Sequence, residues 1–226
     1  MKILAIADVE EKILWDFFDK ELVRDVELII SCGDLSVHYL DFLVSMTNCP
    51  LLYVHGNHDS SYQKNPPLGC TCIEDRVFDY RGLRILGLGG SMRYREGPYM
   101  YEEKEMRSRY SKVRSKITMR NGFDILVTHA PAKGFGDLPD LPHNGFDTFN
   151  EIMYRHKPKY MLHGHVHKSY GRIEGEHVHP AGTHIINCCG YHFLDIGEDE
   201  HPQRGKTGSF LYDLMVSMSR RESDEI

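Results

Sequence analysis

Short apolar runs alternate with stretches of helical periodicity at the start of the chain. Strands are predicted at residues 2–7, 27–30 and 51–54. Between them, residues 11–24 and 36–47 repeat apolar side chains every three or four positions, the spacing of one helix face. Such βα repeats form parallel sheets with right-handed crossovers. The pattern therefore predicts a parallel βαβαβ arrangement through the third strand.

The rest of the chain predicts further strands and helices, with more β-structure toward its end. Residues 77–80 and 83–88 predict a β-hairpin. Gly- and Pro-rich stretches at 60–73 and 130–145 are expected to be loops. The other predicted elements are helices at 102–119 and 146–156 and strands at 124–128, 160–162, 171–173, 184–187, 191–194 and 209–212.

Five of these strands end at residue types that bind metals. The blocks are Asp8, Gly33-Asp34, Gly56-Asn57-His58-Asp59, Thr128-His129 and Gly164-His165-Val166-His167. The carboxyl ends of strands are where α/β sheets place their ligands. Two Asp, one Asn and three His at one edge could hold a pair of divalent metals, and metal pairs hydrolyse phosphate esters.

In this order the blocks resemble the calcineurin-like metallophosphoesterase superfamily, in particular its compact bacterial members. That family carries Asp-x-His, Gly-Asp, Gly-Asn-His-(Asp/Glu), His and Gly-His-x-His. Four blocks match outright across residues 8–167, and the first departs, because Asp8-Val9-Glu10 has Glu in place of His. The resemblance implies an α/β fold, a four-layer α-β-β-α sandwich with two mixed sheets. No linker divides the chain, so we expect one domain over residues 1–218 and a polar tail at 219–226.

The resemblance also implies two divalent metal ions and their ligands. Asp34, whose carboxylate has two oxygens, would bridge both ions. The first ion would take Asp8, Asp34 and His167, with Glu10 as a further candidate, and the second Asp34, Asn57, His129 and His165. A metal-activated hydroxide would then attack phosphorus in line.

Glu10 has two interpretations. Its carboxylate could replace the missing imidazole, which would make the first site harder and favour Mn²⁺ or iron over Zn²⁺. Alternatively, Glu10 is a solvated residue at a helix start, where its negative charge suits the N-terminal dipole.

Other polar residues are candidates for contact with substrate. By resemblance, His58 is not a ligand but faces the substrate and protonates the leaving oxygen or stabilises charge; the alternative is a histidine that packs on its loop. Arg93 and His143 lie in loops that could reach the same edge, although either could be an ordinary surface residue. His177-Val178-His179 repeats the His-x-His spacing without a preceding Gly and is expected to be a surface pair.

Composition narrows the cellular setting. The net charge of −6 argues against nonspecific affinity for nucleic acid or anionic membranes. No apolar run reaches the length of a membrane span, and Met1-Lys2 lead directly into a strand, so no signal peptide is visible. We expect the six cysteines to be reduced thiols in a cytoplasmic protein.

Together these patterns predict a cytoplasmic enzyme, a binuclear metal-dependent phosphohydrolase. A phosphodiesterase acting on a small-molecule or nucleotide phosphate ester is favoured by the resemblance to compact members. The alternatives are a phosphomonoesterase, a protein phosphatase of the same superfamily, and a non-catalytic scaffold with this fold. The sequence indicates neither the substrate nor the oligomeric state.

Overall fold

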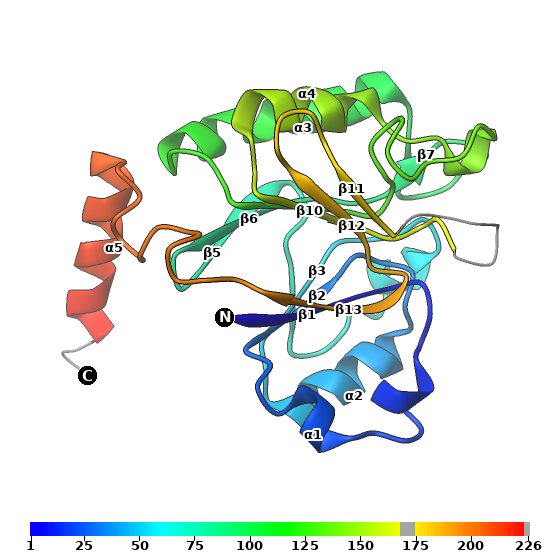
Figure 1. Ribbon diagram of the computed structural model, residues 1–226, viewed down its shortest axis with the longest axis horizontal. Helices are drawn as coiled ribbons and strands as arrows, with labels where there is room; N and C mark the ends of the chain where they lie inside the picture. Colours follow the sequence, from blue (N-terminus) through cyan, green and yellow to red (C-terminus); the bar gives the residue numbers. More distant parts are fainter. Residues whose placement is uncertain (168–174, 224–226) are drawn as a thin grey trace.

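Two β-sheets pack face to face, and helices cover their outer faces (Figure 1). The structure is a computed structural model and describes residues 1–167 and 175–223. Helices α1 and α2 lie on one side of the sheet pair, and α3 and α4 lie on the other (Figure 1). This confirms the predicted four-layer sandwich.

Each sheet is mixed, with antiparallel pairing at its margins. The first sheet has the order β13 (Gly190–Asp195), β1 (Lys2–Ala7), β2 (Leu28–Ser31), β3 (Leu51–Tyr53) and β4 (Cys70–Cys72). The second has the order β11 (Glu176–Val178), β12 (His184–Asn187), β10 (Tyr160–His163), β9 (Ile125–Thr128), β6 (Leu83–Leu88) and β5 (Arg76–Tyr80). Strands β7 (Ser91–Met92) and β8 (Met100–Tyr101) form a small separate pair.

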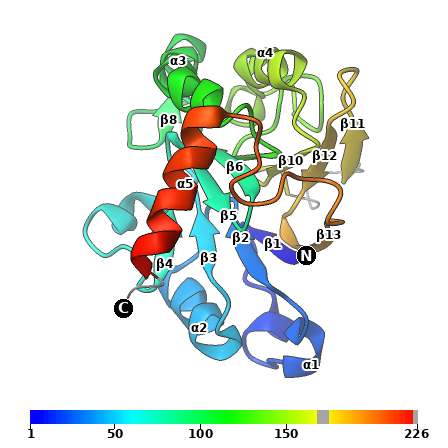
Figure 2. The same ribbon diagram turned by 90° about the vertical axis from the view of Figure 1, so that its left-hand side faces the viewer.

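The helices connect these strands. They are α1 (Lys20–Val23), α2 (Val37–Thr47), α3 (Glu103–Met119), α4 (Asp147–His156) and α5 (Phe210–Ser223), with 3₁₀ turns η1 (Lys12–Leu14), η2 (Asp59–Gln63) and η3 (Leu141–His143). Helix α5 stands at one end of the sandwich, and its first turn lies beside the C-terminus of α3, where the Arg120 guanidinium lies 5.0 Å from the Tyr212 ring (Figure 2). Among the described residues, no helix is both long enough and apolar enough to cross a membrane.

Alternation along the strands explains why the molecule has three apolar layers. In β1, Ile3, Ala5 and Ala7 join the core between the two sheets. Leu4 and Ile6 point the other way, into the core beneath α1 and α2. A third core joins the second sheet to α3 and α4. Since successive side chains of a strand face opposite sides, a strand buried on both faces is apolar throughout.

Most predicted elements are confirmed, but the helix expected at residues 11–24 is broken. Only η1 and the short α1 form there. The carboxylate of Asp19 accepts a hydrogen bond from the Glu21 N–H and so starts a new helix inside the predicted one. Phe17, counted as part of the apolar face, is 73% exposed.

The strand predicted at residues 209–212 is also wrong, because this segment begins α5. Among the side chains of α5 that the structure describes, Tyr212 and Val216 are buried. They are four positions apart, as on one face of a helix. The Asp213 carboxylate accepts from the N–H groups of Thr207 and Gly208 and fixes the turn before the helix. Four residues were too few to distinguish the two periods. The strand predicted at 171–173 lies outside the described residues.

Candidate metal centre

The five predicted blocks meet at one edge of the sandwich, where backbone contacts join the two sheets. The His165 N–H donates to Asp8 Oδ2 at 2.8 Å, which links the end of β10 to the end of β1. His129 Nδ1 lies 2.8 Å from the Cys32 carbonyl oxygen, which links β9 to β2. Donors from both sheets thereby face the same space.

Three of the predicted ligands adopt the left-handed backbone region. The φ angles are 62° at Asp8, 59° at Asp34 and 70° at His165. Each such non-glycine residue costs about 1–3 kcal/mol and persists only where its surroundings enforce it. The chain thus adopts a less stable backbone conformation at three positions of this edge, and in each case the conformation sets the direction of a predicted ligand side chain.

Glycines beside the carboxylates leave room for them. A Cβ atom on Gly56 would lie 2.0 Å from Asp34 Oδ1, and one on Gly164 would lie 2.3 Å from Asp8 Oδ2. Neither position could hold a larger residue without moving a carboxylate. The glycine in each block is therefore a steric requirement of the site.

Four of the predicted ligands form one compact donor group around His129. Its Nε2 lies 3.2 Å from Asp34 Oδ2, 3.0 Å from Asn57 Oδ1 and 3.1 Å from His165 Nδ1. These residues are the set expected to hold the second ion. Imidazole nitrogens with carboxylate and amide oxygens suit Zn²⁺, Mn²⁺ or iron.

The donor group for the first ion lies beside this one and is built on Asp8, and these two sets are called the first and second donor groups after the ions they would hold. Oxygen and nitrogen donors of Asp8 and His167 and the sulfur of Cys189 all lie within 4.8 Å of one another. The Asp8 side chain is 1% exposed, and within the described residues its Oδ1 has no hydrogen-bond partner. That oxygen faces His167 Nε2 at 3.6 Å, an ion-pair contact that does not replace a hydrogen bond. The donors therefore fit a cation.

The charges at the centre reinforce this interpretation. Burial by itself would lower the pKa of His129, but the adjacent Asp34 carboxylate outweighs it and raises that pKa to about 10. Burial and the neighbouring His129 lower the pKa of His165 to about 3. The Asp8 carboxylate raises the pKa of His167. Both carboxylates thus favour positive charge beside them.

Glu10 is the predicted ligand that the structure does not bring to either donor group. Its side chain is exposed, and its Oε1 accepts a hydrogen bond from the Ser36 N–H at 2.9 Å. Ser36 is the N-cap residue of α2. Glu10 therefore lies at a helix N-terminus, as its second interpretation proposed, although the helix is α2 and not the one that follows it in sequence.

The residues expected to contact substrate have different positions. The His58 side chain is exposed, and its N–H donates to Asp34 Oδ1 at 2.7 Å. The His143 ring lies 5.2 Å from the His165 ring, beside the second donor group's histidines. Arg93 instead pairs with Glu105 near the start of α3, at 2.7 Å.

Sequence reasoning missed some contacts at the centre. The Tyr94 hydroxyl lies 3.4 Å from Asn57 Nδ2, yet a single tyrosine in a loop gave no signal. Asp59, the last residue of the Asn57 block, accepts from the N–H groups of Gly56 and Asp34 and ties two blocks together. The expectation that His179 belongs to a surface pair is wrong, since it is 1% exposed and packs against Phe135.

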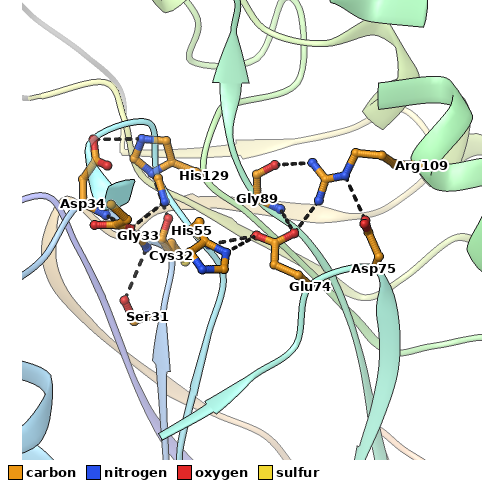
Figure 3. Close-up of polar contacts among 12 residues, drawn as sticks. Ser31, Cys32, Gly33, Asp34, His55, Glu74, Asp75, Gly89, Arg109 and His129 are labelled. Atoms are coloured by element: carbon orange, nitrogen blue, oxygen red, sulfur yellow. Dashed lines mark hydrogen bonds and ion pairs between the residues drawn. The ribbon is translucent and has the colours of Figure 1, made fainter. Parts of the chain in front are cut away.

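A buried ion pair between Glu74 and Arg109 lies next to the centre and contacts His55, two residues before Asn57 (Figure 3). Glu74 accepts from the His55 N–H at 2.8 Å and pairs with the Arg109 guanidinium. Arg109 also donates to the Gly89 carbonyl oxygen at 2.6 Å and to Asp75 at 2.9 Å. This network joins α3 to the segment that leads from β3 into the Asn57 block. The residues of this network belong to none of the five blocks, so the network was not predicted.

The chain belongs to the calcineurin-like phosphoesterase superfamily, whose domain profile matches residues 1–212. A UPF0046 protein of Caenorhabditis elegans is 36% identical over 73 residues, which are 30% of this chain and only 16% of that relative. TT1561 of Thermus thermophilus superposes with a TM-score of 0.60 at 15% identity, covering 86% of this chain and 93% of that one. GAP50, the anchor in the inner membrane complex of Plasmodium, gives 0.51 at 12% identity, covering 84% and 71%. These two structures show the fold alone.

Replacement of Glu74 by Gln should lower the free energy of unfolding at neutral pH by roughly 3 kcal/mol, because the buried Arg109 loses its buried carboxylate partner and keeps only the more exposed Asp75. Burial would raise the pKa of Glu74, but His55 and Arg109 outweigh it and lower the pKa to about 2 from an ordinary 4.5. The contribution of Glu74 is therefore complete above pH 4.5 and is lost as the pH falls toward 2. Urea unfolding should show a wild-type advantage that narrows in acid.

The matched control is Glu21→Gln, which breaks an exposed pair with Arg24 at 2.6 Å. This change should alter stability little at any pH, because exposed ion pairs contribute little. A Glu74→Gln deficit that stays constant down to acid pH would contradict the assigned role of the buried pair.

Proposed function

We propose that this protein is a binuclear metal-dependent phosphohydrolase. The observation that carries the proposal is the presence of two adjacent donor groups, built from Asp8 and Asp34 at the ends of neighbouring strands. Members of its superfamily are phosphoesterases. The donors come from strand ends and loops of both sheets, and yet they converge on one place. This convergence supports a metal centre.

The residues divide into two ligand sets. Asp8 and His167 would hold one ion, while Asn57, His129 and His165 would hold the other. Asp34 would serve both, since its carboxylate has two oxygens and it follows the strand next to that of Asp8. Divalent ions bound there would supply Lewis-acid activation of water and neutralise charge on the phosphate.

His58 is suited to act on the substrate. Its backbone N–H is fixed to Asp34 Oδ1 at 2.7 Å, while its imidazole remains exposed at the mouth of the centre. A histidine in this position can donate a proton to the leaving oxygen of a phosphate ester. His143, which lies beside His165, is a further candidate for contact with the substrate.

We favour a phosphodiester of a small molecule or nucleotide as the substrate, on the resemblance to compact family members. A phosphomonoester or a phosphoprotein are the alternatives within the enzyme class. We also propose a cytoplasmic location, in keeping with six cysteines none of which forms a disulfide.

A scaffold role is the alternative of another class, because GAP50, which shares this fold, is the anchor in the inner membrane complex of Plasmodium. Fold does not decide function, and the site must. A scaffold has no need of strained backbone, buried carboxylates and convergent imidazoles at one edge. These features favour catalysis.

Elemental analysis after saturation with Mn²⁺ should find about two metal ions per chain, the number that a catalytic pair requires. Asp34→Asn should lower both occupancies and nearly abolish hydrolysis, because it removes the charge that both ions share. His38→Ala, a change at an exposed histidine of α2, is the control and should leave metal content unchanged. Hydrolysis of bis(nitrophenyl) phosphate and nitrophenyl phosphate by the loaded protein would compare diester with monoester activity. Wild-type protein holding less than about half an equivalent would favour the scaffold.

His58→Ala should leave metal content intact and reduce turnover by roughly 10²–10⁴-fold for a substrate with a poor leaving group. A nitrophenolate leaves without protonation, so the loss on a nitrophenyl ester should be smaller. Turnover numbers for alkyl and nitrophenyl esters of one phosphate would measure the difference. Equal losses on both substrates would count against proton donation by His58.

A further inference from the structure

The first donor group, which lacks the histidine of the family pattern, includes a cysteine. The sulfur of Cys189 is within 4.8 Å of donor atoms of both Asp8 and His167. The residue is 6% exposed, so it faces this group in the interior of the protein. No block of the sequence includes it.

The fold places Cys189 at the point where the chain crosses between sheets. Strand β12 belongs to the second sheet and β13 to the first, and Cys188 and Cys189 connect them. The Cys188 N–H donates to the His163 carbonyl oxygen at 2.7 Å, and Cys189 forms a bridge to Ala7, which precedes Asp8. The crossing therefore delivers Cys189 to the end of β1.

The side chain of Asn187 fixes this crossing against the histidine block. Its Nδ2 donates to the Val166 carbonyl oxygen at 2.8 Å, and its Oδ1 accepts from the Cys189 N–H at 2.9 Å. Val166 lies between His165 and His167. The Asn187 amide thus fixes the position of Cys189 relative to the segment that carries His167, as a preorganised ligand site requires.

Two further observations point to a cation at this place. Among the described residues, the buried Oδ1 of Asp8 has no hydrogen-bond partner, and His167 Nε2 is 3.6 Å from it, beyond hydrogen-bond distance. Glu10, the acidic residue of the departing block, is engaged by the Ser36 N–H. The sulfur of Cys189 is the additional donor that the structure supplies.

We propose that Cys189 is a thiolate ligand of the first metal ion, together with Asp8 and His167, in place of Glu10. The proposal rests on the metal centre proposed above. On binding, the S–H bond breaks, a sulfur–metal bond forms and the proton passes to solvent, with no change in oxidation state. A thiolate is a soft ligand, so this site would prefer Zn²⁺, Co²⁺ or Fe²⁺ to Mn²⁺ or Mg²⁺.

Cobalt tests the assignment without relying on activity, because a cobalt–thiolate bond gives a charge-transfer absorption in the near ultraviolet. Wild-type protein loaded with Co²⁺ should show this band, and Cys189→Ser should lose it while retaining cobalt in the second group. Cys188→Ser is the matched control. The Cys188 side chain belongs to the core between the two sheets, so the band should remain in this variant. Glu10→Gln should also keep the band.

Metal competition provides a second measurement. Cys189→Asp replaces the soft donor with a hard one and should reduce the preference of the first site for Zn²⁺ over Mn²⁺ by on the order of tenfold, or about 1.4 kcal/mol. Competition titrations of wild type, Cys189→Asp and Cys188→Ser would measure the shift. An unchanged preference in Cys189→Asp would contradict the ligand role.

The outcomes separate this proposal from the proposed function. Wild-type protein that binds two cobalt ions without the sulfur band overturns the role of Cys189 and leaves the metal centre standing. A band that persists in Cys189→Ser has the same consequence. Wild-type protein that binds no cobalt and no Mn²⁺ overturns the metal centre and the Cys189 assignment with it.

Discussion

The structure depends on two carboxylates that are held in its interior. Asp8 and Asp34 follow adjacent parallel strands, and their side chains are 1% and 8% exposed. Burial of such charges costs several kcal/mol each unless other groups compensate. Each carboxylate uses one oxygen to accept a backbone N–H, from His165 and His58 respectively. The other oxygen of each faces an imidazole, at His167 or His129. The two ligand positions are therefore built alike, and both direct negative charge to the same space.

This arrangement constrains the backbone around it. Left-handed conformations at Asp8 and Asp34 turn their side chains out of the sheets and toward the common edge. Gly56 and Gly164 leave room for the carboxylates, since a Cβ atom at either would collide with them. Strain of this kind needs a rigid support. The three apolar cores supply it on both faces of each sheet, and the pair of Glu74 with Arg109 supplies it behind the Asn57 block.

The sequence predicted those features that depend on local pattern. Most of the strands and the helices α2–α4 follow from periodicity, and the mixed sandwich follows from the family resemblance that the five blocks carry. The short strands β4, β7, β8 and β11 were not predicted, and β4 lies in the stretch 60–73 that was expected to be a loop. The helix at 11–24 failed because one capping side chain, Asp19, restarts the helix, and the strand at 209–212 failed because four residues do not define a period. The blocks predicted Asp8, Asp34, Asn57, His129, His165 and His167 as ligands, and the structure brings these residues together in two donor groups. Cys189 and Tyr94 were missed, because their proximity arises from a sheet crossing and a loop, which only the folded chain brings together.

Under the assignment proposed above, Cys189 takes the ligand role that the family pattern gives to the residue at position 10, and this needs no change in the fold. In the family pattern, the histidine two residues after the first Asp comes from the same loop as that Asp. Here the Glu10 side chain is directed to the N-terminus of α2, where a carboxylate can stabilise the helix. Cys189, in the segment that crosses between the sheets, pairs with Ala7 next to Asp8. A side chain of this segment can therefore approach the Asp8 carboxylate without an insertion into the chain. Asn187 already fixes that crossing to the histidine block. Chemical hardness at the first position would then be set by a residue outside the five blocks. Metal preference in such a centre cannot be inferred from the blocks alone, because it depends on which neighbouring segment completes the ligand set.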